Sequence, residues 1–267
     1  MRRVYMQLTD EIEILFPQRV GQPANETIVD TDELIDRLKS ENPESMAVPI
    51  SRSGYLQSIE DEKILAISMQ KDLVILLKAA PGDFLINGAN VAEILSKQPI
   101  PAEIAQNLEN MFLIGTFPNC TQDILFPVRQ LEEIAIRALS PGINDPHTAI
   151  EAIDYLASAL AMLIKRDQPS ALRLDIEDKA RVIAQSPNFE TILKQAYQQI
   201  HHYGQTDVTV VTKLFTALEA IKEHTENYPE KCALITSFKK QIYNKSKDSI
   251  TSESDREIIR NSYRHTV

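Results

Sequence analysis

The feature that most constrains the fold of this chain is the segment Ala138–Ala149, which lies between two stretches of apolar residues at helical spacing. It contains two prolines, a glycine and several short polar side chains. Proline and glycine interrupt helices, while Ser, Asn and Asp side chains bond readily to nearby backbone groups. We therefore expect a fixed joint between two helices, with hydrogen-bonding groups clustered at it.

The chain on the C-terminal side of Thr121 repeats apolar residues three or four positions apart, which is typical of packed amphipathic helices. Successive apolar stripes begin at Ile124, Ala149, Phe189, Val211 and Leu234. Gly204 is placed to end one helix, and Asp207 to begin the next. Everything beyond Thr121 is predicted to be helical, as an antiparallel bundle.

The N-terminal part changes character along its length. Residues 1–16 and a short segment from Thr31 have helical spacing, with the polar stretch through Asn25 as a loop between them. From Val48 the period becomes two, which predicts strands. Further strands and short helices are predicted at 60–70 (helix), 73–77 (strand), 91–95 (strand), 102–110 (helix) and 111–114 (strand).

Residues 82–94 resemble the hairpin of biotinyl/lipoyl-type barrel-sandwich domains, because glycines at 82 and 88 permit tight turns between alternating apolar residues. Carrier domains of that type present a lysine at the hairpin tip. No lysine lies between Pro81 and Ile94, so a structural module is favoured over a swinging arm.

These patterns predict an α+β protein with three parts. Residues 1–45 form an N-terminal helical segment. Residues 46–118 form a small barrel-sandwich-hybrid-like β module. Residues 119–267 form the antiparallel helical bundle that carries the joint.

Composition excludes several classes of protein. Of the 267 residues, 43% are hydrophobic, as in an ordinary globular protein. The formal net charge of -10 disfavours a nucleic-acid partner, because contacts to phosphates require clustered Lys and Arg. Cys120 and Cys232 stand alone, as expected for reduced thiols in the cytosol. No stretch approaches 18 apolar residues, so we expect the chain as given to be soluble, without a membrane span.

Signals for catalysis, cofactors and metals are weak. His201 and His202 are adjacent on a predicted helix and point about 100° apart, so they cannot easily share one metal ion. No nucleophile elbow, phosphate-binding loop or metalloprotease motif occurs. No catalytic residue, cofactor or metal is therefore predicted.

The joint has two interpretations. In the first, its polar groups only cap helices: Gly142 permits a positive φ, Asp145 is the N-cap and Pro146 suits the first turn. In the second, Arg137 beside a helix N-terminus forms a site for a small anion. Gln122 and Asp123 join that site only if another element folds back. The ligand-binding candidates are Arg137, Ser140, Asn144, Asp145, His147, Thr148, Asp154, Gln122 and Asp123.

The same residues carry a family resemblance. Arg137–Pro146 with Thr148-Ala149 is similar to the signature of the bacterial family called domain of unknown function 2254, described as predicted membrane proteins. Ser53–Gln57, Pro81–Phe84 and Gln122-Asp123 fit the same family in order. Its members usually carry several transmembrane helices before this region. The resemblance thus implies either the excised soluble portion of such a protein, with residues 1–45 as its juxtamembrane segment, or a natural stand-alone form. It implies no reaction.

We therefore expect a non-catalytic domain on the cytoplasmic side of the bacterial inner membrane, with a role in assembly, sensing or gating. The alternatives are an enzyme or a small-anion site at the joint 137–154, and a soluble gate of a channel or transporter. The expected partner is the membrane-embedded segment of the parent or another membrane protein. The charged tail at 252–265 has few apolar anchors, which also favours a homo-oligomer.

Overall fold

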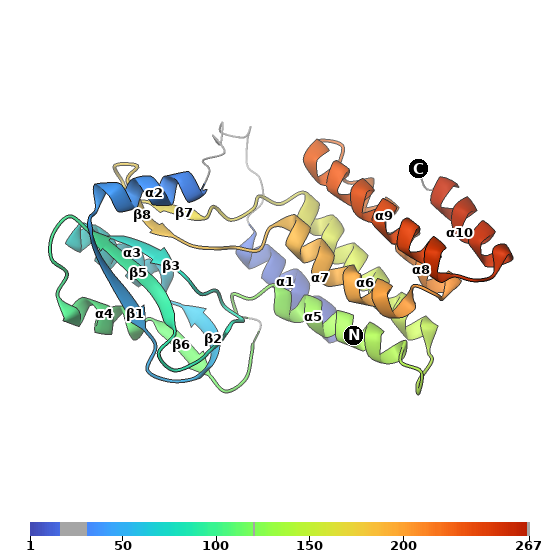
Figure 1. The fold of residues 1–267 in the computed structure, drawn as a ribbon, viewed down its shortest axis with the longest axis horizontal. Coiled ribbons are helices and arrows are strands. Elements are labelled where there is room, and N and C mark those ends of the chain that lie inside the picture. The colour runs from blue at the N-terminus through green and yellow to red at the C-terminus, as the bar shows by residue number, and fades with distance from the viewer. Residues whose placement is uncertain (17–30, 120, 266–267) are drawn as a thin grey trace. The chain divides into compact units, whose positions relative to one another are not determined.

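The computed structural model describes residues 1–16, 31–119 and 121–265 of an α+β protein (Figure 1). The chain divides into two compact units. The helical unit comprises Met1–Arg19, Ile124–Gln168 and Pro187–Val267. The mixed unit comprises Val20–Asp123 and Pro169–Ser186. The three-part division predicted from the sequence stays a prediction.

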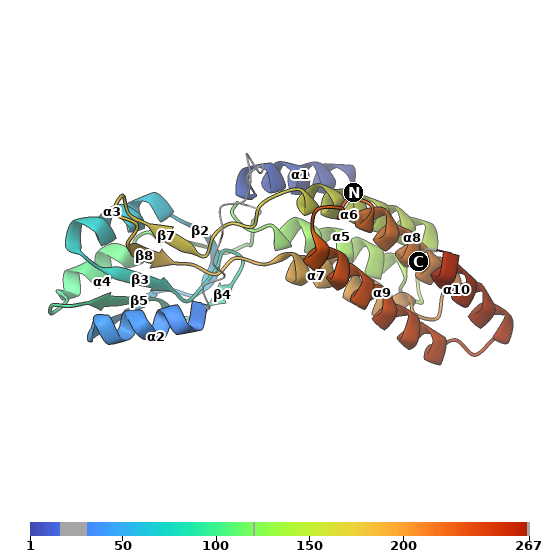
Figure 2. The same ribbon diagram turned by 90° about the horizontal axis from the view of Figure 1, so that it is seen from above.

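The helical unit is built from amphipathic helices whose apolar faces meet in one core. Figure 2 shows how the helices of this unit lie alongside one another. Its helices are α1 (Arg2–Leu15), α5 (Leu125–Ala138), α6 (Pro146–Ile164), α7 (Phe189–Gly204), α8 (Val208–Lys222), α9 (Pro229–Ser249) and α10 (Glu253–His265). The helical stripes predicted from the sequence are confirmed in α1 and in α5 to α9, while α10 lies within the predicted charged tail and buries only Ile259. Asp207 is the N-cap of α8, as predicted, and its carboxylate accepts from the backbone N–H groups of Thr209 and Val210.

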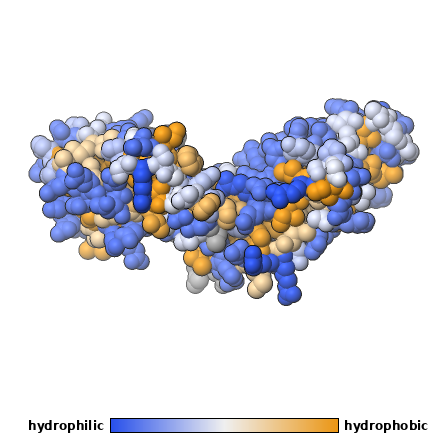
Figure 3. Space-filling model, turned by 90° about the horizontal axis from the view of Figure 1, so that it is seen from below, coloured by the Kyte–Doolittle hydropathy of each residue, from blue (hydrophilic) through white to orange (hydrophobic). Residues whose placement is uncertain are grey.

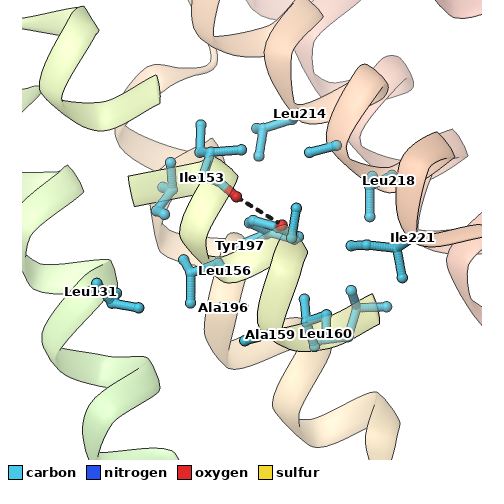
Figure 4. Packing of buried hydrophobic residues seen from close by; sticks show 14 of the residues in the cluster. Leu131, Ile153, Leu156, Ala159, Leu160, Ala196, Tyr197, Leu214, Leu218 and Ile221 are labelled. Carbon is cyan, nitrogen blue, oxygen red and sulfur yellow. Dashed lines mark hydrogen bonds between the residues drawn. The ribbon is translucent and has the colours of Figure 1, made fainter. Parts of the chain in front are cut away.

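Helix α6 packs against α1, α5, α7 and α8, so it lies at the centre of this core. Figure 4 shows leucines and alanines of α6 interleaved with those of α7 and α8. Tyr197 of α7 is fully buried among them, and its hydroxyl donates a 3.2 Å hydrogen bond to the Ile153 carbonyl of α6. Burial raises the pKa of Tyr197, because the phenolate would lose its solvation there.

Helix α6 also bears on the prediction that no segment resembles a membrane span. Among the described residues it is the one helix long and apolar enough to cross a bilayer, by length and composition alone. Half of its most apolar window is buried inside the protein, and a core helix of a globular protein passes the same test. Figure 3 shows one face of the molecule, on which hydrophobic residues form separate patches between hydrophilic ones.

The mixed unit contains a five-stranded sheet of order β1-β5-β3-β8-β7 and a three-stranded sheet of order β4-β2-β6. The strands are β1 (Glu44–Pro49), β2 (Gly54–Ile59), β3 (Val74–Leu77), β4 (Phe84–Leu85), β5 (Asn90–Ser96), β6 (Phe112–Gly115), β7 (Leu172–Leu174) and β8 (Ala180–Ile183). The helices are α2 (Thr31–Glu41), α3 (Asp61–Lys71) and α4 (Ala102–Glu109). The predicted α+β class is confirmed, whereas the barrel-sandwich comparison is not.

Strands β7 and β8 overturn the prediction that everything beyond Thr121 is helical. β8 pairs in parallel with β3, with Ile75 opposite Val182, while its other edge pairs antiparallel with β7. Arg181 fixes this addition, since its guanidinium bonds to Asp72 and Asp175 at 2.7 Å each. Each of these short strands contains an arginine, so neither shows the continuous apolar run that revealed β3, and their sequence alone did not reveal them.

The remaining predictions of secondary structure for the N-terminal part agree with the structure to within a few residues. The predicted loop through Asn25 and the stop at Pro17 lie outside the described residues.

Candidate functional site

The joint between α5 and α6, residues Leu139–Asp145, is closed by its own backbone. The N–H groups of Ile143 and Asn144 donate to the Ser140 carbonyl at 3.0 and 2.9 Å, and that of Asp145 donates to the Ala138 carbonyl at 2.8 Å. Gly142, which permits a positive φ, does not adopt one. Asn144 takes it instead, at 48°, because its short polar side chain tolerates the left-handed region.

The polar side chains of the joint bond mainly to the joint itself. Ser140 Oγ donates to the Arg137 carbonyl at 2.7 Å. Asp145 is the N-cap of α6, as predicted: it accepts from Thr148 N at 3.2 Å and from Thr148 Oγ1 at 2.6 Å. Both hydrogen bonds lower the pKa of Asp145, and the bond from the Thr148 hydroxyl has a larger effect than the bond from the Thr148 backbone N–H.

This geometry determines what the joint can do chemically. The N-terminus of α6 already faces a carboxylate of its own chain, and a second anion there would meet like charge. The side chains of Arg137 and His147 are exposed to solvent. The capping interpretation accounts for Ser140, Asp145 and Thr148, while binding of a ligand to this group stays a prediction.

Asp154 lies apart from the joint, nine residues or about 13 Å further along α6. Its carboxylate pairs with Lys213 Nζ of α8 at 2.5 Å. Asp154 also lines an open groove of about 490 Å³ beside Ala157, Ser158 and His224. The structure therefore places it in a different local setting from the other candidates.

Gln122 and Asp123 belong to the mixed unit and precede α5, whereas the joint follows that helix. Gln122 fastens β2: its amide accepts from Ile59 N at 2.8 Å and donates to the Ile59 carbonyl at 3.1 Å. Asp123 is buried, and its carboxylate lies so close to Gly82 that a Cβ there would collide with it. Both side chains thus have a structural use within the mixed unit.

One buried acid was not among the predicted candidates. Glu132 of α5 is 4% exposed, accepts from the Gln195 amide through Oε2, and its Oε1 is buried without a hydrogen-bond partner. Burial is the main reason that the pKa of Glu132 is raised. Its position next to Leu131 on the core-facing arc of α5 was the available signal, while the neighbouring Glu133 faces solvent.

A second missed feature is a pocket of about 240 Å³ between α7 and α9, which we call the α7–α9 pocket. It is lined by Lys194, Gln198, His201, Phe238, Gln241, Ile242 and Lys245. Over the part of the chain that the structure describes, no three His, Cys, Asp or Glu side chains are placed to share a metal ion.

Comparison with known proteins places this architecture in a family. The family described as "Predicted membrane protein (DUF2254)" matches residues 1–220, which include the joint and most of both units. The chain belongs to this family. The match ends within α8, so α9 and α10 of this DUF2254 protein follow it.

Curated relatives of this DUF2254 chain include "Uncharacterized protein Rv1290c" of Mycobacterium tuberculosis and "Uncharacterized protein Mb1321c" of Mycobacterium bovis. Each is 28% identical over 224 residues, covering 82% of this chain. The chain spans 43% of the length of each of these relatives. No solved structure matches it significantly.

Proposed function

We propose that this chain is a non-catalytic part of a bacterial inner-membrane protein, that it lies on the cytoplasmic side, and that it acts in assembly, sensing or gating. The observation that carries the proposal is the state of the joint. Its nucleophilic and acidic groups are engaged in capping, with Asp145 held by Thr148 and the Ser140 hydroxyl donating to a backbone carbonyl. A catalytic acid or nucleophile needs a free face toward its substrate.

Family membership supports the membrane setting, since DUF2254 is described as a predicted membrane protein and the curated relatives are more than twice as long as the matched segment. Of the three roles, sensing fits a domain that has stable cores and pockets of its own. The partner in this proposal is a membrane-embedded segment of a longer parent.

Turnover assays test the non-catalytic part of the proposal. The purified chain is incubated with a panel of phosphorylated and acyl substrates, beside the variant Asp145→Asn. We expect no product above the buffer control. Turnover that the variant abolishes would contradict the proposal and support an enzyme at the joint.

Protease accessibility tests the location. A tagged full-length copy of the Mycobacterium tuberculosis relative is expressed in a mycobacterial host, and its matched region is exposed to protease in spheroplasts and in inverted membrane vesicles. We expect cleavage only in the inverted vesicles. Cleavage in intact spheroplasts would place the region outside the membrane and reject the cytoplasmic assignment.

A further inference from the structure

The α7–α9 pocket is formed by residues at helical spacing on two helices. Lys194, Gln198 and His201 lie four and then three positions apart on α7, so they share one face. Phe238, Gln241, Ile242 and Lys245 occupy the corresponding face of α9. Figures 1 and 2 both show α7 and α9 side by side.

The floor of the pocket is apolar, apart from one imidazole, and is fixed in place. Phe238 and Ile242 are buried, and His201 is 5% exposed. His201 Nε2 is 2.9 Å from Ser246 Oγ, which ties the floor of α7 to α9. One turn further on, Ser249 Oγ donates to Gln205 Oε1 at 3.0 Å. These contacts make a cavity that exists before any ligand arrives.

The rim carries positive charge and amides. Lys194, Lys245, Gln198 and Gln241 are exposed around the floor, and no carboxylate lines the cavity. Within the described residues, no acidic group lies within 4.0 Å of Lys245 Nζ. In a chain of net charge -10, an acid-free pocket between two lysines is a marked local departure.

Lys194 has a partner, but a weak one. Its Nζ is 2.6 Å from Glu190 Oε1 one turn earlier on α7, and both side chains are nearly half exposed. Exposed pairs at this spacing contribute about 0.3–0.5 kcal/mol. An anion in the pocket can therefore share Lys194 with Glu190, or replace Glu190 as its partner, at little cost in free energy.

Burial is the first cause of the low pKa of His201, about 4, and the positive charges of Lys245 and His202 add to it. At neutral pH the imidazole is therefore uncharged, and Lys194 and Lys245 are the charged groups of the lining.

We propose that the α7–α9 pocket binds a small phosphate-bearing anion, with Lys194 and Lys245 on its phosphate oxygens and Phe238 and Ile242 against its carbon skeleton. Lysine is a common phosphate ligand, acting as a point charge, and the amides of Gln198 and Gln241 supply further donors. A volume of about 240 Å³ is below the range for drug-sized ligands, which suits a molecule of the size of glycerol phosphate.

The same chemistry occurs in soluble phosphate esters and in the headgroups of anionic phospholipids. The inference goes beyond the proposed function, because binding concerns the chain itself and requires no membrane partner. The pocket can fail to bind a phosphate-bearing anion while the turnover and protease experiments still support the proposed function. Equally, the anion can bind while those experiments contradict the proposed function.

Calorimetric titration of the full chain tests the site, with sn-glycerol 3-phosphate and inorganic phosphate as probes and glycerol as the uncharged control. We expect saturable binding of sn-glycerol 3-phosphate that Lys245→Gln weakens at least about tenfold, because one charge-assisted hydrogen bond is lost. The matched control is Lys240→Gln, which removes the same charge from an exposed position on α9 outside the lining. It should leave the affinity unchanged.

Vesicle flotation distinguishes the two sources of the phosphate. Flotation with phosphatidylglycerol but not phosphatidylcholine vesicles, lost in Lys245→Gln and kept in Lys240→Gln, would support the site and assign it to a lipid headgroup. Saturable binding of sn-glycerol 3-phosphate by the chain, without flotation with phosphatidylglycerol vesicles, would support the site and assign it to a free metabolite.

Two outcomes would overturn the proposal. One is that neither the soluble probes up to millimolar concentration nor the phosphatidylglycerol vesicles bind. The other is equal weakening by Lys245→Gln and Lys240→Gln, which would show a diffuse response to net charge. Far-ultraviolet circular dichroism of each variant confirms folding, since both substitutions are on exposed side chains.

Discussion

The joint Leu139–Asp145 and the α7–α9 pocket are both rich in polar groups, but they use them differently. In the joint, Ser140 bonds to a backbone carbonyl and Asp145 holds Thr148, so these groups stabilise the turn that they belong to. In the pocket, Lys245 has no acidic partner among the described residues, and the floor is tied to α9 by the contact between His201 and Ser246. A run of consecutive polar residues can therefore mark a rigid turn, while the proposed binding site is formed by residues at helical spacing on two helices.

The comparison makes a testable distinction: changes in the joint should alter stability, and changes in the pocket rim should alter binding. The first prediction concerns Asn144. Replacing it by Val forces a β-branched residue to a φ of 48°, and we expect a loss of about 1–3 kcal/mol in the free energy of unfolding. Urea denaturation measures it.

The control for Asn144→Val is Gly142→Ala. Gly142 has no positive φ and open space around its would-be Cβ, so Ala should be neutral or slightly stabilising there. Equal losses in both variants would show that the joint is not the fixed turn described above.

The second prediction concerns pH and the floor of the pocket. The pKa of His201 falls from 6.5 to about 4 on folding, so between these values the unfolded chain binds more protons. The contribution of His201 to stability is complete above about pH 6.5 and is lost as the pH falls toward 4. The free energy of unfolding should fall by up to about 1.4 kcal/mol per pH unit in this window.

Denaturation of the wild type and of His201→Gln at several pH values isolates that slope. Glu132, whose pKa is raised, contributes with the opposite sign in both proteins and cancels in the difference. Parallel stability curves for the two proteins would mean that His201 is not buried as an uncharged ring.

The third prediction concerns the N-cap of α6. Asp145→Ala removes the acceptor for the Thr148 N–H and should lower the midpoint of thermal unfolding by about 2–4 °C. Asp145→Asn keeps a capping oxygen and should lose less. The affinity for glycerol phosphate should stay unchanged in both variants. A loss of affinity would instead support a binding site for the anion at the joint.

The smallest effect is expected at Asp154. Its pair with Lys213 is partly exposed, so Asp154→Asn should change the free energy of unfolding by less than about 1 kcal/mol. Added salt should reduce the difference further, because it screens exposed charges. A large loss that persists in salt would indicate that Asp154 has a further role in the groove.

Patterns that depend on neighbouring residues were predictable from the sequence. The stripe containing Ile192 and Ala196 fixes α7, and a single Asp207 places the start of α8, because helix spacing and capping are local. The choice of Asn144 over Gly142 for the left-handed residue was not predictable, since both residues tolerate that conformation.

Long-range partners were the other gap. β8 pairs with β3, which lies more than a hundred residues earlier in the chain, and the four residues of β8 do not indicate which strand it pairs with. The α7–α9 pocket has the same origin. The spacing of Lys194, Gln198 and His201 is visible in the sequence, but the face of α9 that meets them is decided by packing.

The short strands β7 and β8 have a consequence for dissecting the molecule. The backbone crosses from one unit to the other after residues 19, 123, 168 and 186, so neither unit is a single continuous piece of chain. A fragment ending at residue 118 would lack β8 and leave the edge of β3 without its hydrogen-bonded neighbour. Such a bare apolar edge invites association with other chains, so fragment studies of the mixed unit should carry residues 169–186 in trans or by circular permutation.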